Sequence, residues 1–432
     1  MRPAWLGGAS VTRDRTVVGI DVGTTKVCTL IAEAANSGPM HVVGFGIAPS
    51  HGMRKGMVVD VEQVVESISA SLEKAERDTG RRVESAFVSF TGAHITCLNN
   101  RGVIGIARDD RAISYDDVER AVEAAQVVNV LPNREIVHAI PRTFVVEGQD
   151  GVRNPVGMVG NRLDVEAHLI TAAATALQNL ARCVEQAGVE PIGFVLGGLA
   201  AADAVVTAEE REMGVALVDI GGGTTSVVVF VDGSPWHSAV IGVGGFQITN
   251  DIGVGLRTPF HEAEELKLGH GRALSSAYRP EETLRIATFG GSERGGLPGH
   301  ELGNIIEARL SEIFQLVGEE LGRSGYLGRL PAGIVLTGGT ALLSGIAELG
   351  QTILEVPCRI GRPEGLAGLR EALTSPAHAT SVGLALWGAR ELGRIAGPVP
   401  FRSAVGVERV SRNGDGLDVG GRLKSWFRAF LP

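Results

Sequence analysis

The most informative stretch of the chain is Leu217-Val-Asp-Ile-Gly-Gly-Gly-Thr-Thr225, in which a buried apolar strand (214–219) runs into a glycine-rich turn before a second strand. The same unit stands near the start, where strand 16–21 runs through Asp21-Val-Gly-Thr-Thr-Lys26 into another strand. The two aspartates are 198 positions apart (219 − 21). A strand, a tight turn and a second strand form a hairpin, unlike the strand–loop–helix of a Walker or Rossmann site. We therefore expect a duplicated α/β domain in which each copy presents one hairpin loop.

Both turns carry the groups that a phosphate chain with Mg²⁺ needs. Glycines let backbone N–H groups come close, threonine hydroxyls donate hydrogen bonds, and an aspartate can hold a hydrated metal ion. The first turn also supplies the cation Lys26 for the β- and γ-phosphates. One such turn is a common way to end a buried strand, but two copies in the same setting predict a pair of loops that clamp a triphosphate.

Two further motifs fit a nucleoside. Thr337-Gly338-Gly339-Thr340 follows an apolar strand, and its glycines would let a base and ribose lie against the backbone. Glu264 and Lys267 stand at i and i+3 on one helix face. From the sequence alone, the first motif is equally a plain strand end, and the second is equally a surface ion pair.

Composition bounds the remaining possibilities. The 432 residues have a formal net charge of −9, which argues against a nucleic-acid binder, and the 44% hydrophobic content is ample for a large core. No apolar run reaches the ~18 residues of a membrane span, and residues 1–15 lack a signal peptide's apolar segment, so we expect a disordered leader and a cytosolic chain. The cysteines are widely separated, which predicts reduced thiols; they are Cys28, Cys97, Cys183 and Cys358.

Hydrophobic periodicity predicts the other main elements. Helices are expected at 60–79, 115–127, 175–186, 302–321 and 379–390. Strands are expected at 83–90, 95–106, 136–147, 162–171 and 333–337. Residues 278–301 are polar and rich in glycine and proline, which predicts a surface loop, and 398–420 read as a linker.

With these motifs in place, the chain resembles the actin, chaperone and sugar-kinase superfamily, and within it the FtsA family of bacterial cell division proteins. The resemblance covers about residues 16–432. Besides the second hairpin loop, the strand 334–339 and the C-terminal segment, the stretches that carry it are Gly52-Met-Arg-Lys-Gly-Met-Val-Val-Asp60, Phe87-Val-Ser-Phe-Thr-Gly92, Arg142-Thr-Phe-Val-Val-Glu-Gly148 and Asn154-Pro-Val-Gly-Met158.

The resemblance implies an actin-like two-lobed α/β fold of duplicated ribonuclease H-like domains, with an inserted 1C subdomain and the nucleotide in the cleft between the lobes. Subdomain 1A would comprise 16–84, 164–204 and 382–397, 1C would be 85–163, 2A would comprise 205–250 and 329–381, and 2B would be 251–328. It also implies ATP and Mg²⁺ as ligands, self-association into filaments, and binding of the C-terminal tail of FtsZ by 2B. Other division proteins would be further partners, at the cytoplasmic face of the cell membrane and the division septum.

The resemblance assigns roles to matching residues. Asp21 and Asp219 would coordinate Mg²⁺ through water. The phosphate-binding residues would be Gly23, Thr24, Thr25, Lys26, Gly221, Gly222, Gly223 and Thr224, and the nucleoside-binding residues would be Glu264, Lys267, Gly338 and Gly339. Related proteins of the superfamily carry an acid that polarises the attacking water, whereas the segment Gly197-Gly198-Leu199-Ala200-Ala201-Ala202 has none. We therefore expect slow or no ATP hydrolysis and assign no catalytic residue.

The last twelve residues, 421–432, form an amphipathic pattern. On a helix, five apolar side chains fall within an arc of roughly 140° and the basic residues lie opposite. This suits a surface of anionic lipids. The predicted membrane-binding residues are Arg422, Leu423, Lys424, Trp426, Phe427, Arg428, Phe430 and Leu431.

The leading hypothesis is an ATP-binding division protein that anchors the FtsZ ring to the membrane. Two alternatives stay open at this point: an actin-like protein of type IV pilus assembly, and a small-molecule kinase of the same superfamily. The C-terminal segment discriminates best, because neither alternative explains a lipid-binding helix.

Overall fold

Two five-stranded sheets with the same topology form the centre of the molecule. The computed structural model describes residues 16–33, 39–107, 111–289, 293–368 and 371–392. In the first lobe β1 (Thr16–Val22), β2 (Lys26–Glu33) and β3 (His41–Pro49) form an antiparallel meander, and β6 (Ser85–Phe90) and β11 (Glu190–Leu196) add parallel to β1. The strand order is β11-β6-β1-β2-β3.

The second sheet repeats this plan. Strands β12 (Val215–Ile220), β13 (Thr225–Val231) and β14 (Ser234–Ile241) form the meander, and β17 (Ile334–Thr337) and β18 (Cys358–Ile360) add in parallel, in the order β14-β13-β12-β17-β18. Both expected hairpins are therefore present, and the actin-like duplicated fold is confirmed. Their strands are almost continuously buried because helices cover them.

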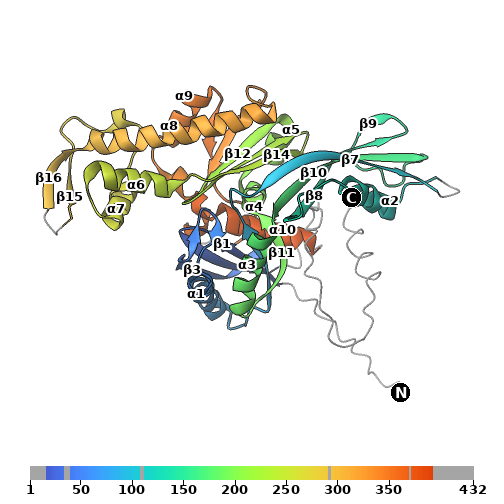
Figure 1. Cartoon of the computed structure of the whole chain (residues 1–432), viewed down its shortest axis with the longest axis horizontal. Coiled ribbons are helices and arrows are strands. Elements are labelled where there is room, and N and C mark those ends of the chain that lie inside the picture. The colour runs from blue at the N-terminus through green and yellow to red at the C-terminus, as the bar shows by residue number, and fades with distance from the viewer. Residues whose placement is uncertain (1–15, 34–38, 108–110, 290–292, 369–370, 393–432) are drawn as a thin grey trace, which may run out of the picture.

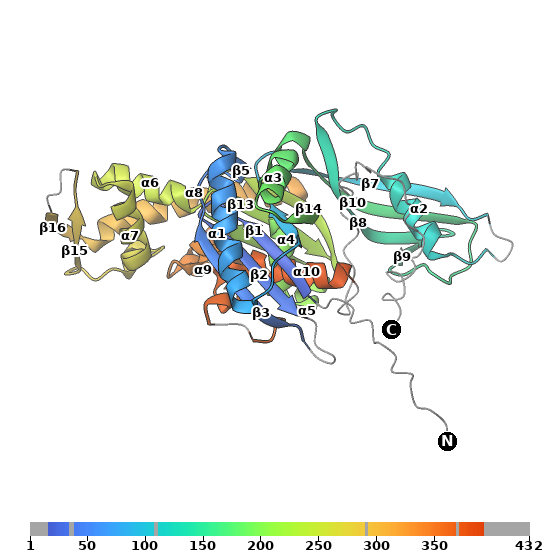
Figure 2. The ribbon, with the colours of Figure 1, turned by 90° about the horizontal axis from the view of Figure 1, so that it is seen from below.

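Helices cover both faces of the first sheet, and those on one face separate it from the second sheet. Figure 2 shows α1 (Val61–Thr79) and α3 (Ala174–Gln186) across the outer face of the first sheet. On its other face, α10 (Ala379–Glu391) packs against β1 and against α4 (Gly197–Val205), which in turn contacts β12 and β13. The small residues of α4 and α10 allow this close crossing. A Cβ on Gly383 would lie 1.7 Å from the carbonyl oxygen of Ala200.

A third sheet, in the order β7-β10-β8-β9, extends to one side with α2 across it (Figure 1). Its elements are β7 (Thr96–Gly105), α2 (Tyr115–Ala125), β8 (Arg134–Val146), β9 (Gln149–Val152) and β10 (Arg162–Ala173). It has its own apolar core, which includes Val122 and Leu163. The predicted limits 85–163 for the inserted subdomain differ from this sheet at both ends, because β6 pairs with β1 and β11 while β10 continues to Ala173.

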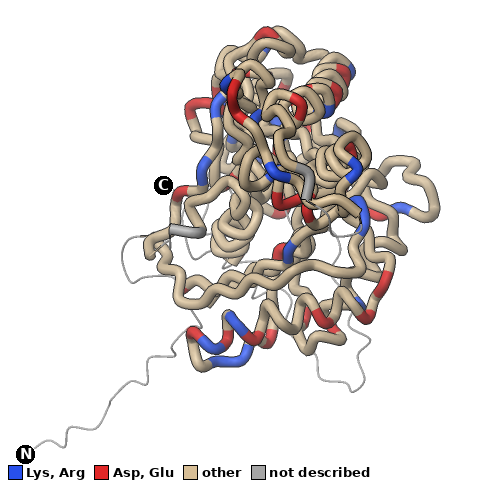
Figure 3. The backbone as a smooth tube through the Cα atoms, turned by 90° about the vertical axis from the view of Figure 1, so that its left-hand side faces the viewer, with Lys and Arg blue, Asp and Glu red and all other residues tan. Residues whose placement is uncertain are grey.

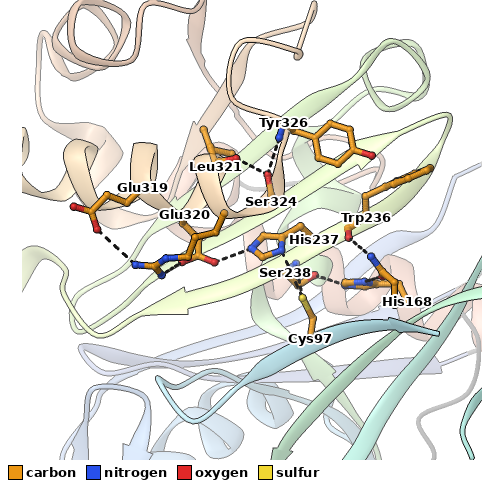
Figure 4. A network of polar contacts seen from close by, with 12 residues as sticks. Cys97, His168, Trp236, His237, Ser238, Glu319, Glu320, Leu321, Ser324 and Tyr326 are labelled. Atoms are coloured by element: carbon orange, nitrogen blue, oxygen red, sulfur yellow. Dashed lines mark hydrogen bonds and ion pairs between the residues drawn. The ribbon is translucent and has the colours of Figure 1, made fainter. Parts of the chain in front are cut away.

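A polar network joins the inserted sheet to the edge strand β14 of the second lobe (Figure 4). His237 contacts Glu320 of α8 (Gly299–Ser324) through its Nε2 at 2.8 Å, and its neighbour Ser238 contacts His168 of β10 at 3.0 Å. The backbone N–H of Ser238 also donates to Cys97 Sγ of β7 at 3.4 Å. Contacts from Cys97 and His168 to Ser238 thus orient the inserted sheet on β14, while Glu320 holds the neighbouring His237.

The far end of the second lobe is mostly helical (Figure 1). It contains α6 (Gly245–Leu256), α7 (Phe260–His270), α8 (Gly299–Ser324) and a hairpin of β15 (Thr283–Ala287) and β16 (Glu293–Pro298). The interpretation of 278–301 as a surface loop is therefore wrong. Leu284 and Ile286 alternate into the core of this lobe, but the surrounding glycine and proline hide that period in the sequence.

The remaining elements are short connections. They are β4 (Met53–Arg54), β5 (Met57–Val58), α5 (Ala208–Met213) and α9 (Ile346–Leu354), with 3₁₀ turns at Ser275–Ala277, Gly339–Leu342, Glu371–Thr374 and Pro376–His378. All four cysteines lie in the described residues and are free thiols. The predicted leader 1–15, linker 398–420 and helix 421–432 lie outside the described residues.

Charge is mixed along the chain. Seen from the end that carries α6 and α7, Lys and Arg alternate with Asp and Glu rather than gathering on one face (Figure 3). Within the described ranges, none of the helices combines the length and the apolar content that crossing a membrane requires.

Candidate nucleotide site

The first hairpin loop leaves β1 at Asp21. Gly23 N–H donates to the Lys26 carbonyl at 3.0 Å and closes the turn. Ser89 Oγ donates to Asp21 Oδ1 at 2.7 Å and Ser381 Oγ to Oδ2 at 3.3 Å. Burial raises the pKa of Asp21, while these two hydroxyls and the Lys26 charge act in the opposite direction. The carboxylate is therefore held in one orientation before any ligand arrives.

The second hairpin loop repeats this geometry at Asp219. Gly221 N–H donates to the Thr224 carbonyl at 2.9 Å, and Thr380 Oγ1 donates to Asp219 Oδ2 at 3.3 Å. Consecutive residues at the start of α10, Thr380 and Ser381, thus each hold one aspartate, one from each lobe. Burial raises the pKa of Asp219 to about 6, with the nearby Asp21 carboxylate as a further cause.

The two loops meet across the cleft between the lobes. A Cβ on Gly222 would lie 2.3 Å from Thr25 Cγ2, and one on Gly223 would lie 2.9 Å from Thr24 Oγ1. Glycine permits this approach, because a side chain at either position would have to displace Thr25 or Thr24. The structure therefore brings together the residues that the sequence assigned to the phosphates from each side.

Lys26 lies among the charges of both loops. Burial lowers the pKa of its ammonium, whereas the carboxylates of Asp21 and Asp219 raise it. Its Nζ lies 3.4 Å from His378 Nδ1, and burial together with the Lys26 charge lowers the pKa of His378 to about 4. The imidazole is therefore neutral at pH 7 and can accept a hydrogen bond from the ammonium.

The predicted nucleoside side is also assembled. Lys267 Nζ donates to Glu264 Oε2 at 2.7 Å, to Thr249 Oγ1 at 2.8 Å and to the Gly245 carbonyl at 3.2 Å. The Lys267 side chain is 9% exposed, so the pair is not a surface ion pair. Gly245 N–H in turn donates to the Gly221 carbonyl at 2.9 Å, which ties this pair to the second loop.

Gly338 and Gly339 end β17 beside the second loop. Gly338 has φ 89°, and a Cβ there would lie 2.3 Å from Asp219 Oδ1. At Gly339 a Cβ would meet none of the described atoms within 4 Å, so its face is open. Thr340 Oγ1 donates to the Gly221 carbonyl at 3.2 Å. Gly338 therefore allows close packing against Asp219, and Gly339 leaves its backbone exposed.

The segment that lacks an acid begins α4 directly after β11. A Cβ on Gly198 would lie 3.0 Å from Ser226 Cβ and from Val228 Cγ2 of β13, so this turn packs tightly under the second lobe. Gly197 to Ala202 are all buried. This turn has no carboxylate with which to orient a water molecule.

Sequence reasoning missed three supporting groups: Ser89, the pair Thr380–Ser381, and His378. Ser89 lies inside the stretch Phe87-Val-Ser-Phe-Thr-Gly92 that carried the resemblance, which was a signal for it. The helix 379–390 showed only small residues, and its hydroxyls are 161 and 360 positions from their aspartates. No local pattern reports contacts at such separations.

Comparison with known proteins places the chain among division proteins. It is 41% identical to the cell division protein FtsA of Pseudomonas aeruginosa over 88% of this chain and 91% of that protein. The chain belongs to the FtsA family. The FtsA of Escherichia coli K12 is 35% identical over 87% of this chain and 90% of its own length. The family model "Cell division protein FtsA" matches residues 216–383, and "SHS2 domain inserted in FTSA" matches 92–171, which covers most of the inserted sheet.

Solved structures outside the FtsA family share the fold. The PilM-PilN type IV pilus biogenesis complex gives a TM-score of 0.62 at 19% identity, covering 86% of this chain and 98% of that one. MreB 5 of Spiroplasma citri bound to AMPPNP gives 0.52 at 15% identity, covering 86% and 96%. At such identities the likeness concerns the fold alone. The FtsA identities are about twice as high, so FtsA membership, and not the pilus or kinase alternative, describes this chain.

A prediction for Asp219 follows from its raised pKa. The folded pKa of about 6 lies above the ordinary 3.8, so the stability that Asp219 contributes is full below pH 3.8 and falls as the pH rises through about 6. At pH 8, Asp219→Asn should therefore be more stable than the nucleotide-free parent and melt at a higher temperature. We expect a gain of about 1–2 kcal/mol in the free energy of unfolding, a value reduced to allow for partial solvent exposure of residue 219. At pH 3.8 the two should melt alike. Parallel melts at both pH values test this, and a less stable variant at pH 8 would contradict it.

Proposed function

We propose that this FtsA-family protein binds Mg²⁺ and ATP between its two hairpin loops and uses the nucleotide as a switch for assembly at the membrane. The observation that carries the proposal is the matched pair Asp21 and Asp219, one from each lobe, held by the adjacent hydroxyls of Ser381 and Thr380. A ligand that contacts both loops would fix the position of one lobe relative to the other. The fold neighbour bound to AMPPNP supports a nucleotide ligand for this fold.

The residues present fit the proposed ligand. Paired carboxylates with raised pKa values, beside the cation Lys26, suit a hydrated divalent ion, and Asp21 and Asp219 would hold Mg²⁺ through water. The metal ion would neutralise phosphate charge. Backbone N–H groups and hydroxyls of both loops, with Lys26, would bind the phosphates, and Glu264, Lys267, Gly338 and Gly339 would contact the nucleoside.

Hydrolysis is proposed to be slow or absent. Phosphoryl transfer to water needs a group that orients the water, and the turn Gly197–Ala202 supplies only glycine, leucine and alanine. The protein would then respond to whether ATP is bound in the cleft, and would turn ATP over slowly or not at all.

The proposal also includes the two ends of the tether. Residues 251–328, with α7, α8 and the β15–β16 hairpin, would receive the FtsZ tail, and 421–432 would lie on anionic lipid at the cytoplasmic face of the cell membrane. One such helix binds weakly, so attachment would strengthen when copies assemble side by side. Assembly and membrane binding would then be one coupled event at the division septum, shared with other division proteins.

Titration of Mg-ATP into the full chain tests the nucleotide proposal. Lys26→Ala removes the phosphate cation, and Gly222→Val places methyl groups where Thr25 lies. Each should weaken ATP binding by about 100-fold or more. Gly105→Val is the matched control, because a Cβ there would approach only the Asn161 carbonyl, at 3.9 Å. If the parent binds no nucleotide, or if either loop variant binds as the parent does, the proposal is wrong.

A further inference from the structure

The short hairpin of β4 and β5 has a rigid tip. It joins β3 to α1, and its base is closed by hydrogen bonds from Val59 and Asp60 N–H to the Gly52 carbonyl at 2.8 and 3.1 Å. Gly56 has φ 76°, and a Cβ there would lie 2.4 Å from the Thr91 carbonyl. Lys55 at the tip has φ 50°, a left-handed conformation that lysine rarely adopts. Positive φ at both Lys55 and Gly56 is the geometry that a two-residue hairpin turn requires, so the tip is well defined.

The hairpin connects the two phosphate loops. At its root, Ser50 N–H donates to the Thr25 carbonyl of the first loop at 3.1 Å. At its tip, the Lys55 side chain reaches the second lobe, since a Cβ on Gly242 would lie 3.7 Å from Lys55 Cδ and 3.6 Å from Ala93 Cβ. The stem of this lysine therefore lies across the cleft from its own lobe.

Gly242 begins the segment that supports the second loop. Val243 accepts from Thr225 Oγ1 at 2.9 Å, and Phe246 N–H donates to the Gly222 carbonyl at 2.7 Å. Gly242 follows the end of β14, which β13 and β12 separate from β17 and its Gly338–Gly339 pair. Lys55 thus meets the segment that supports the second loop on the side away from the Gly338–Gly339 pair.

Charge balance favours an anion at Lys55. At the phosphate loops, the carboxylates of Asp21 and Asp219 face the ammonium of Lys26. A triphosphate brings more negative charge than Mg²⁺ neutralises, so a second cation would stabilise it. Lys55 is exposed, and none of the acidic side chains in the described ranges forms an ion pair with it.

We propose that Lys55 is a second phosphate-binding lysine, which reaches from the β4–β5 hairpin across the cleft to the terminal phosphate of the bound triphosphate. The inference rests on the proposed nucleotide site and adds a residue that discriminates ATP from ADP. With the terminal phosphate gone, the ammonium loses its partner while its stem keeps the contact at Gly242.

Affinities of the full chain for fluorescent ATP and ADP analogues, both with Mg²⁺, test this. Lys55→Met keeps the apolar stem and should weaken ATP binding about tenfold or more while changing ADP binding less than about threefold. Lys55→Arg should restore most of the ATP affinity, because it restores the cation. Arg54→Met is the matched control, since it removes an adjacent exposed cation of the same hairpin, and should leave both affinities unchanged.

The outcomes separate the two proposals. If the parent binds both nucleotides and Lys55→Met changes neither affinity, or changes both equally, the role of Lys55 is wrong and the nucleotide site stands. Equal losses in Lys55→Met and Arg54→Met would also overturn it, since general hairpin charge would then suffice. If the parent binds neither nucleotide, both proposals fail.

Discussion

Removing residues 421–432 is expected to abolish flotation of the protein with anionic vesicles. Arg422, Lys424 and Arg428 contribute about 1 kcal/mol each near an anionic surface, so their loss alone lowers the partition coefficient by roughly 100-fold. Loss of the buried apolar face lowers it further. A chain that ends at Gly420 should stay in solution under conditions in which the full chain floats.

Two comparisons make this result specific. Vesicles of neutral lipid should retain much less of the full chain than anionic vesicles, because the basic residues then lack partners. Changing Trp426 and Phe427 to Glu in the full chain should act like the truncation. Equal flotation of the full and shortened chains would show that 421–432 is not the anchor.

Gly383→Ala is expected to destabilise the whole fold. Its Cβ would lie 1.7 Å from the Ala200 carbonyl oxygen, where α10 crosses α4 between the two sheets. Backbone on both sides prevents relief, so we expect a loss of at least about 4 kcal/mol, which is a large part of a typical folding free energy. The variant should melt at least about 5 °C lower or fail to accumulate as soluble protein. Because α10 also positions Thr380 and Ser381, surviving protein should bind nucleotide poorly.

Gly322→Ala is the matched control for this substitution. Gly322 lies in α8, and a Cβ there would meet none of the described atoms within 4 Å. Alanine is the better helix former, so this variant should be unchanged or more stable by about 0.5–1 kcal/mol. If Gly383→Ala melts within about 2 °C of the parent, the α4–α10 crossing does not pack as described.

The part of the fold that the sequence predicts is the part with local, repeated signals. Each hairpin is encoded within one short stretch, 16–33 or 215–231, as an apolar strand, a glycine turn and a return strand, and both copies appear where expected. The pairing of Glu264 with Lys267 follows from helical spacing alone. Helix α1 was expected one residue early, at the Asp60 that caps it.

The parts that escaped prediction depend on distant contacts. Whether β6 belongs to the first lobe or to the inserted sheet is decided by its pairing with β1 and β11, which no single segment encodes. The hydroxyls of Thr380 and Ser381 belong to a helix whose composition signals only close packing. In β15–β16, two buried positions alternate among glycines and prolines too numerous for the period to stand out.

The central claim, that nucleotide in the cleft governs membrane attachment, is tested most directly by flotation of the full chain with anionic vesicles, with and without Mg-ATP. Lys26→Ala, which retains 421–432, provides the comparison. We expect Mg-ATP to increase the vesicle-bound fraction of the parent severalfold and to leave that of Lys26→Ala unchanged. If the parent floats equally with and without Mg-ATP, or if Lys26→Ala responds as the parent does, the cleft does not control attachment.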